Sequence, residues 1–233
     1  MKLIKASTKA IKFAIKNWHY SKSVPSVSIA YSVFDNSNVF CGVICFGHGA
    51  TMNIAKPFGL TNGQCVELVR VALNGKQSST TKAVSIALRL LKKDAPLVKL
   101  IVSYADSEQG HKGIIYQGGN WYFIGSSTDT NIIVNGKRQH RRTLGSLYGT
   151  NSIIKMKAMG LNVGERIFTL PKYKYIYPLD KKLIPMCKAM AKPYPKNAAV
   201  AHKGERQDTN QEGAFDSTSP LNFNPFNNST EQA

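Results

Sequence analysis

A unit of strand, polar loop, helix and strand in the middle of the chain restricts the possible folds most. Residues 65–73 form an apolar run typical of a strand, and the polar segment 74–81 separates them from a helix-prone stretch at 83–93. A second buried strand is expected at 99–105. This alternation of strands and helices favours an α/β domain, in which helices cover a sheet.

Further elements are expected on both sides of this unit. Apolar residues recur at near-helical spacing between lysines over 4–18, which predicts an amphipathic basic helix. Two apolar runs that flank the turn-forming sequence 35–38 predict a β-hairpin. The runs lie at 27–34 and 39–46, and later elements are expected as a helix at 113–120 and strands at 121–125 and 173–177.

The 233 residues are enough for one substantial core, which is expected at 1–202. Residues 203–233 are rich in Asn, Gln, Ser and Thr with few large apolar side chains, which predicts a disordered tail. No apolar run approaches the roughly 20 residues of a membrane helix. The N-terminus is interrupted by lysines and lacks the apolar segment of a secretory signal, so a soluble protein of the cytoplasm is expected.

The four cysteines lack the paired spacing of a zinc ribbon and are too sparse for a disulfide framework. Reduced thiols that pack as small apolar residues are therefore expected. Cys41 and Cys45 are four residues apart in a predicted strand, which predicts that both point to one face of the sheet.

Charge favours a polyanionic partner. The chain has 31 Lys and Arg against 13 Asp and Glu, a formal net charge of +18. The segment 203–233 holds two basic and five acidic residues, so the preceding 202 residues carry +21. Such a body attracts nucleic acid, the alternative being a generally solvated basic surface.

The polar loop before the helix at 83–93 is a candidate phosphate site. Free backbone N–H groups and the positive end of a helix dipole suit a phosphate, and the loop adds a lysine and hydroxyl groups. Ser79 or Thr80 could equally be a simple N-cap. The candidate cofactor-binding residues are Lys76, Gln77, Ser78, Ser79 and Thr80, together with Asn120.

The stretch 103–122 carries the densest set of candidate catalytic residues. The strand that ends in Ser-Tyr-Ala-Asp places Asp106 at the carboxyl edge of a sheet, where open α/β sheets bind ligands. The following helix presents Tyr116 and Asn120 on one face, four residues apart, so Asp106 and Tyr116 can meet at one site. The alternative is that Asp106 caps a turn and Tyr116 packs in the core.

This stretch resembles the signature of the phage Mom family, of the form Ser-Tyr-Ala-Asp, Gly-His-x-Gly, Ile-Tyr-Gln and Asn-Trp. Further matching segments occur in the family's order over roughly residues 15–180. They are Trp18-His19-Tyr20-Ser21, Glu67-Leu68-Val69-Arg70, Arg141-Arg142 and Tyr148-Gly149-Thr150. Departures from the family pattern are Gly118-Gly119 and a loop at 76–80 that matches the usual pyrophosphate loop poorly.

The resemblance implies a fold like that of the GCN5-related N-acetyltransferases (GNAT), an α/β fold with a mixed central sheet flanked by helices. It also implies conversion of the adenine exocyclic amine in double-stranded DNA to a carbamoylmethyl (acetamido) derivative, which shields phage DNA from host nucleases. The functional residues of the family fall at His19, Tyr20, Arg70, Asp106 and Tyr116.

Each implied residue has a chemical role and an alternative. Asp106 or His19 is the candidate general base for the weakly nucleophilic amine, and Tyr116 could donate to a leaving group or oxyanion. Arg70 could hold a phosphate or carbonyl oxygen, or form a salt bridge with Glu67. His19 could instead be a helix C-cap. A His–Asp pair with a tyrosine could bind a metal such as iron, but without a clear third ligand no metal site is assigned.

A base stacked in duplex DNA must be exposed before N6 can react, and aromatic side chains usually hold such a base. Tyr20, Trp121 and Tyr122 are candidates. A basic cluster suited to DNA phosphates, or alternatively a solvated loop, is formed by Arg138, His140, Arg141 and Arg142.

The donor is open between acetyl-CoA and an activated glycine. Acetyl transfer would give an N-acetyl amide, whereas a glycyl amide on N6 is a constitutional isomer of the carbamoylmethyl amine. Glycyl transfer from glycyl-tRNA, followed by rearrangement, therefore fits the product's atoms, and tRNA would be a second partner. Competing functions are a conventional GNAT acting on a protein or small-molecule amine and a non-catalytic DNA-binding accessory protein. The sequence does not determine the oligomeric state.

Overall fold

The computed structural model describes residues 1–49 and 53–195. A mixed seven-stranded sheet forms the body, with the strand order β1-β2-β3-β4-β5-β10-β6. Neighbouring strands are antiparallel except β4 and β5, which run parallel. The strands are β1 (Lys2–Lys5), β2 (Ile29–Phe34), β3 (Phe40–Gly47), β4 (Cys65–Leu73), β5 (Leu100–Asp106), β6 (Tyr122–Ser127) and β10 (Lys172–Pro178).

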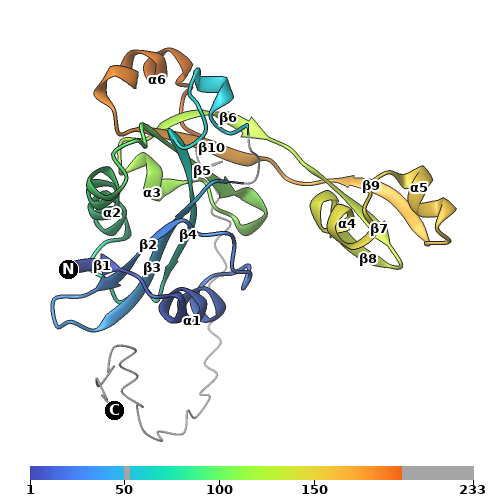
Figure 1. Cartoon of the computed structure of the whole chain (residues 1–233), viewed down its shortest axis with the longest axis horizontal. Helices are drawn as coiled ribbons and strands as arrows, with labels where there is room; N and C mark the ends of the chain where they lie inside the picture. The colour runs from blue at the N-terminus through green and yellow to red at the C-terminus, as the bar shows by residue number, and fades with distance from the viewer. Residues whose placement is uncertain (50–52, 196–233) are drawn as a thin grey trace, which may run out of the picture.

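Helices cover both faces of this sheet (Figure 1). On one face α2 and α3 pack over the largest buried cluster, which includes Leu88, Tyr116 and Tyr175. On the other face α1 packs over Val43 and Cys45, and α6 over Ile176. These helices are α1 (Thr8–Trp18), α2 (Thr80–Asp94), α3 (Ile114–Gln117) and α6 (Ile184–Met190). The α/β class, with a mixed central sheet flanked by helices as expected of a GNAT-like fold, is confirmed.

An arm is inserted between β6 and β10 and projects away from the body (Figure 1). Its three-stranded sheet has the order β8-β7-β9, and its own core contains Ile132, Leu144 and Met156. The arm elements are β7 (Thr130–Val134), β8 (Lys137–His140), α4 (Arg141–Tyr148), α5 (Ile153–Ala158) and β9 (Val163–Phe168). The sequence analysis expected no elements here, and single 3-10 turns lie elsewhere at Lys56–Phe58, Ser107–Gln109 and Lys181–Leu183.

Two local predictions were wrong. The helix expected over 4–18 begins only at Thr8, because Ser7 caps it by accepting a hydrogen bond from the Ala10 N–H, and the residues before it pair with β2. Cys41 and Cys45 are buried, but in clusters on opposite faces of the sheet. The pairing of β2 with β3 shifts between Val33 and Phe34, where β3 contains one extra residue. An extra residue reverses the alternation of side chains between the two faces of the sheet, which explains the difference.

No helix within the described residues is long and apolar enough to cross a membrane. The predicted disordered tail at 203–233 lies outside the described residues, and the single domain expected at 1–202 stays a prediction.

Candidate active site

The parallel strand pair opens into a cleft of about 1200 Å³. β4 and β5 pair only from Cys65–Glu67 to Leu100–Val102 and diverge beyond these residues. The space between them is bordered by the end of α1, the start of α2, the loop before α3 and the base of the arm. The cleft therefore lies beyond the carboxyl ends of parallel strands, the usual ligand position in an open α/β sheet.

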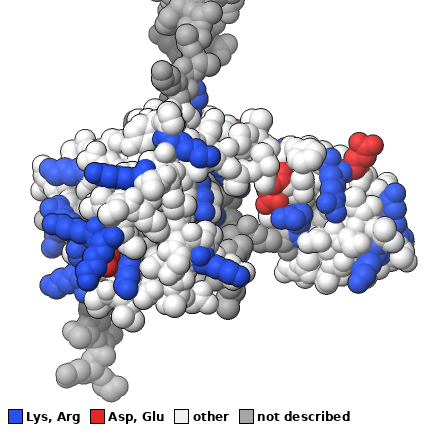
Figure 2. Space-filling model, turned by 90° about the horizontal axis from the view of Figure 1, so that it is seen from above, with Lys and Arg blue, Asp and Glu red and all other residues white. Residues whose placement is uncertain are grey.

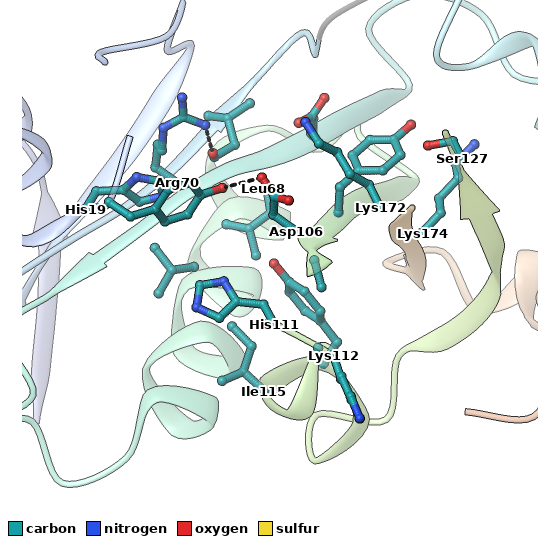
Figure 3. Close-up of a pocket in the computed structure, with 18 of the residues that line it drawn as sticks. His19, Leu68, Arg70, Asp106, His111, Lys112, Ile115, Ser127, Lys172 and Lys174 are labelled. Atoms are coloured by element: carbon teal, nitrogen blue, oxygen red, sulfur yellow. Dashed lines mark hydrogen bonds between the residues drawn. The ribbon is translucent and has the colours of Figure 1, made fainter. Parts of the chain in front are cut away.

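Tyr20 and Asp106 both line this cleft and contact each other. Figure 3 shows Asp106 in the cleft. The Tyr20 hydroxyl donates to Asp106 Oδ2 over 3.3 Å, while Asp106 Oδ1 accepts from the Glu108 N–H over 3.1 Å. Asp106 therefore caps a turn, which was the alternative to a catalytic role. Its second carboxylate oxygen nevertheless faces the cleft. Burial, followed by the neighbouring Asp106 charge, raises the pKa of Tyr20 to about 12, so the phenol keeps its proton near neutral pH.

His19 is a neutral hydrogen-bond donor in this arrangement. Its ring stacks on Tyr20 with centroids 4.4 Å apart, and burial, then the Arg70 charge, lowers its pKa to about 4. Its Nδ1 accepts the Ser21 backbone N–H over 3.1 Å, and a backbone N–H can only donate. The ring proton must therefore sit on Nε2. His19 also ends α1, but it does so with its backbone N–H, which donates to the Ile15 carbonyl.

Arg70 lies beside His19 and is held by backbone carbonyls (Figure 3). Its guanidinium donates to the Val69 carbonyl over 2.7 Å and to the Ser23 carbonyl over 3.3 and 3.4 Å. No Arg70–Glu67 ion pair is present among the described residues. Arg70 therefore ties β4 to the segment after α1 and keeps its positive charge at the cleft.

Tyr116 lies in the wall of the same cleft but is 7% exposed and packs in the core. Its hydroxyl is 2.8 Å from Ser103 Oγ, which is 2.9 Å from the Leu68 carbonyl. The carbonyl can only accept, so the single Ser103 proton goes there and Tyr116 donates to Ser103. The Tyr116 proton is thus already used within the protein, and burial raises its pKa to about 12.

The loop between β5 and α3 rests directly on the sheet. Gly113 has a φ of +79°, and a Cβ at this position would overlap the ring of Tyr175. Tyr175 donates to the Lys112 carbonyl over 2.5 Å. The loop is thereby fixed, and His111 lies edge-on to Tyr20 with ring centroids 5.7 Å apart.

The predicted cofactor residues divide between two places. Gln77 and Thr80 line the cleft at the start of α2 and are joined by a 2.9 Å hydrogen bond. The Gln77 Oε1 atom is buried without a partner in the described part of the chain. Ser79 is the N-cap of α2, while Lys76 and Ser78 line a separate small pocket near Asp35.

Three residues close to α3 in the sequence do not line the cleft, although a role in the site was predicted for each. Trp121 is 1% exposed and packs against Tyr116 and Tyr177, so it cannot stack on a DNA base. Tyr122 packs on the α6 side of the sheet and does not line the cleft, and Asn120 occupies a left-handed turn with φ +59° outside it.

The basic cluster belongs to the arm and is partly neutralised. Arg138 forms an ion pair with Glu108 over 2.8 Å. His140 and Arg141 both contact Asp129, over 2.6 and 3.1 Å. These contacts hold the base of the arm beside the cleft, and they replace the solvated loop that was the alternative. The side chain of Arg142 falls outside what the structure describes.

A lysine that was not predicted from the sequence lies in the wall of the cleft formed by β10. Lys174 of β10 is half-buried in the cleft, with its Nζ 5.1 Å from the Phe58 ring centroid and 6.0 Å from that of Tyr104. Burial lowers its pKa. Lys172 also lines the cleft, and the alternation Lys-Tyr-Lys-Tyr in β10 was the available signal, because it places both lysines on one strand face.

The side chains that line the cleft come from both faces of the sheet. Gln77, Thr80 and Ile115 border it on the α2 side, whereas Tyr104 and Lys174 belong to the face covered by α6. The Tyr20–Asp106 pair therefore lies in a cleft with two chemically different walls. In the described part of the chain no group of three or more His, Cys, Asp or Glu side chains is arranged to hold a metal ion.

A family model described as the Mom protein family matches residues 2–196. The protein named methylcarbamoylase mom of Escherichia phage Mu is 28% identical over 137 residues, which are 57% of this chain and 57% of that protein. The chain thus matches a little over half of that relative's length.

Solved structures that resemble the chain include two acetyltransferases. A Bacillus subtilis acetyltransferase in complex with CoA is 11% identical, with a TM-score of 0.41 and coverage of 76% of this chain and 97% of that one. The spermidine N-acetyltransferase of Vibrio cholerae is 10% identical, with a TM-score of 0.42 and coverage of 80% and 99%.

Proposed function

The chain belongs to the Mom protein family, and on that premise we propose that it is a transferase that modifies adenine in double-stranded DNA. The exocyclic N6 amine becomes a carbamoylmethyl amine, and phage DNA so modified escapes host restriction in the host cytoplasm. The observation that carries the proposal is the Tyr20–Asp106 pair in a cleft lined by residues from both faces of the sheet.

Asp106 is the general base in this proposal. The N6 lone pair is delocalised into the purine ring, so the amine must lose a proton as its new bond forms. Of the two candidate bases, Asp106 has a carboxylate oxygen in the cleft, whereas His19 Nδ1 is already occupied by the Ser21 N–H. The neutral His19 and the protonated Tyr20 then act as donors that orient the carboxylate and the incoming carbonyl.

The two walls of the cleft contact different substrates. The start of α2, with Gln77 and Thr80, offers free backbone N–H groups and the positive end of a helix dipole to a phosphate of the donor. The opposite wall offers Tyr104 for stacking on an extruded adenine and Lys174 for contact with the DNA backbone or a ring nitrogen.

The donor is an activated acyl group, either on CoA or as glycyl-tRNA. In the glycyl route the N6–H bond and the ester C–O bond break, the N6–C bond forms, and the tRNA hydroxyl takes the proton. The resulting glycyl amide then rearranges to the isomeric carbamoylmethyl amine. Purified protein supplied with glycyl-tRNA or with acetyl-CoA separates the routes, because only the first supplies the additional nitrogen atom that the product contains.

Mass spectrometry of nucleosides from plasmid DNA tests the function. The expected result is a new deoxyadenosine adduct after expression of the chain in a bacterium, and no adduct with Asp106→Asn. Unmodified DNA in the presence of folded, expressed protein would contradict the proposal. It would instead favour an acyltransferase acting on another amine, or a DNA-binding accessory protein.

A further inference from the structure

The arm carries an exposed leucine on the side that faces the body. Thr143 of α4 lines the cleft, and Leu147 follows it by four residues on the same helical face. Leu147 is 62% exposed, whereas its neighbour Leu144 is fully buried in the arm core. The exposed side chain is therefore not needed to hold α4 on the arm.

The position of α4 places this residue near the path to the cleft. Figure 1 shows α4 on the side of the arm nearer the main sheet and α5 on the far side. Four residues of helix span about 6 Å, so Leu147 lies roughly one turn beyond the rim at Thr143. Arg141, the first residue of α4, and His140, the last residue of β8, also line the cleft.

The charge of the arm identifies the kind of partner that this surface fits. Residues 130–168 contain seven Lys and Arg and a single acidic residue, Glu165. Figure 2 shows Lys and Arg side chains on both the body and the arm, together with acidic side chains on the arm. An exposed apolar side chain on an arm of net positive charge suits a duplex, in which phosphates flank stacked bases.

We propose that Leu147 is a wedge that enters the base stack of duplex DNA and fills the space left when an adenine turns into the cleft. Extruding a base sacrifices its stacking and pairing, and apolar side chains such as leucine are inserted between base steps by DNA-bending proteins. This inference rests on the proposed function, since it requires that the cleft receives an adenine.

The test compares duplex DNA with the same sequence as a single strand, using adenine adducts as the readout. Leu147→Ala is expected to lower the initial rate on the duplex by roughly tenfold or more, and to leave the rate on the single strand within about twofold, because no stack has to be opened there. Leu147→Met should retain most of the duplex rate. Ile154→Ala is the matched control, because Ile154 is 81% exposed on α5, on the far side of the arm.

A second readout does not depend on group transfer. Duplexes with 2-aminopurine in place of adenine become more fluorescent when the base leaves the stack. The wild-type protein without donor should produce this increase, and Leu147→Ala should abolish most of it while changing DNA affinity by less than about twofold, since phosphate contacts dominate affinity.

Three results would overturn the wedge. They are an unchanged duplex rate for Leu147→Ala, an equal loss on duplex and single strand, and a larger duplex-specific loss for Phe168→Ala, which removes another exposed apolar residue of the arm. A Leu147-dependent fluorescence increase without any adduct would support the wedge and contradict the proposed chemistry. Absence of both signals in the wild type would contradict both.

Discussion

The Tyr20 hydroxyl donates to Asp106 Oδ2 over 3.3 Å, although 86 positions separate the two residues in the chain. The bond joins the segment after α1 to the end of β5 at the point where β4 and β5 diverge. Partial burial, together with the Asp106 charge, raises the pKa of Tyr20, and the pair still lines an open cleft. The pair therefore combines a fixed geometry with access for a substrate.

Removing the Asp106 carboxylate should abolish transfer without unfolding the protein. Asp106→Asn keeps an oxygen that can accept the Glu108 N–H and thus preserves the turn, but it cannot take a proton. Loss of a general base costs roughly 10²- to 10⁴-fold in rate. Initial adduct formation is the measurement. Tyr20→Phe is the companion variant, with an expected loss of roughly tenfold for a missing orienting hydrogen bond, and equal losses for both would argue against Asp106 as the base.

Stability should decrease as the pH falls from about 6.5 to 4 because of His19. Its pKa is about 4 in the folded protein and 6.5 in the unfolded chain, so between these values the unfolded state binds more protons. The free energy of unfolding is therefore highest above pH 6.5 and decreases through this window. Because the ring is only half-buried, we expect at most about 2 kcal/mol.

Urea unfolding at pH 7 and pH 5 measures this effect. His19→Asn is the matched variant, since its side-chain oxygen can still accept the Ser21 N–H while the titrating ring is gone. The wild type should lose more stability than His19→Asn on moving to pH 5. An identical loss in both proteins would assign the pH dependence to other groups.

Ser103 should contribute more to stability than the Tyr116 hydroxyl. Ser103→Ala removes the hydrogen-bond partner of both the Leu68 carbonyl and the Tyr116 hydroxyl. Each buried polar group left unpaired should lower the free energy of unfolding by about 1–3 kcal/mol. Tyr116→Phe leaves the Ser103–Leu68 bond intact and should cost about 1 kcal/mol. Chemical denaturation of the two single variants and the double variant gives the coupling. A larger cost for Tyr116→Phe would refute the proton assignment.

The sequence was informative where local chemistry alone determines the structure. The strands around 65–73 and 99–105 and the helix between them follow from apolar periodicity, and the clustering of His19, Tyr20, Asp106 and Tyr116 around one cleft agrees with their motif order. The role of Trp121 could not be predicted, because its burial depends on β10, whose aromatic residues come 50 or more positions later.

The arm was missed for a related reason. Its strands are short, and its core of Ile132, Leu144 and Met156 is assembled from separate segments that show no long periodic pattern. The sequence showed the positive charges of this region but not their partners. Glu108 meets Arg138 only when the arm packs beside the body, and Asp129 meets Arg141 only when β7 and β8 pair as a hairpin.

Asp129 should control how firmly the base of the arm is held together. Its side chain accepts from the Thr130 N–H over 2.8 Å and contacts His140 and Arg141, and these interactions lower its pKa despite partial burial. Asp129→Ala removes all three contacts at the hinge, whereas the arm core contains none of them. We therefore expect local loosening of the arm with little change in the body.

Hydrogen exchange followed by mass spectrometry can resolve this difference. In Asp129→Ala, peptides from 128–141 and 163–170 should exchange roughly tenfold faster, because a loss of about 1.4 kcal/mol in local opening free energy corresponds to that factor. Peptides from β4 and β5 should stay within about twofold of the wild type. Glu165→Ala is the control, because it removes an acidic residue of the same arm that forms no described ion pair. Uniformly faster exchange across the body would show instead that Asp129 stabilises the whole domain, and unchanged exchange in the arm would show that its ion pairs contribute little.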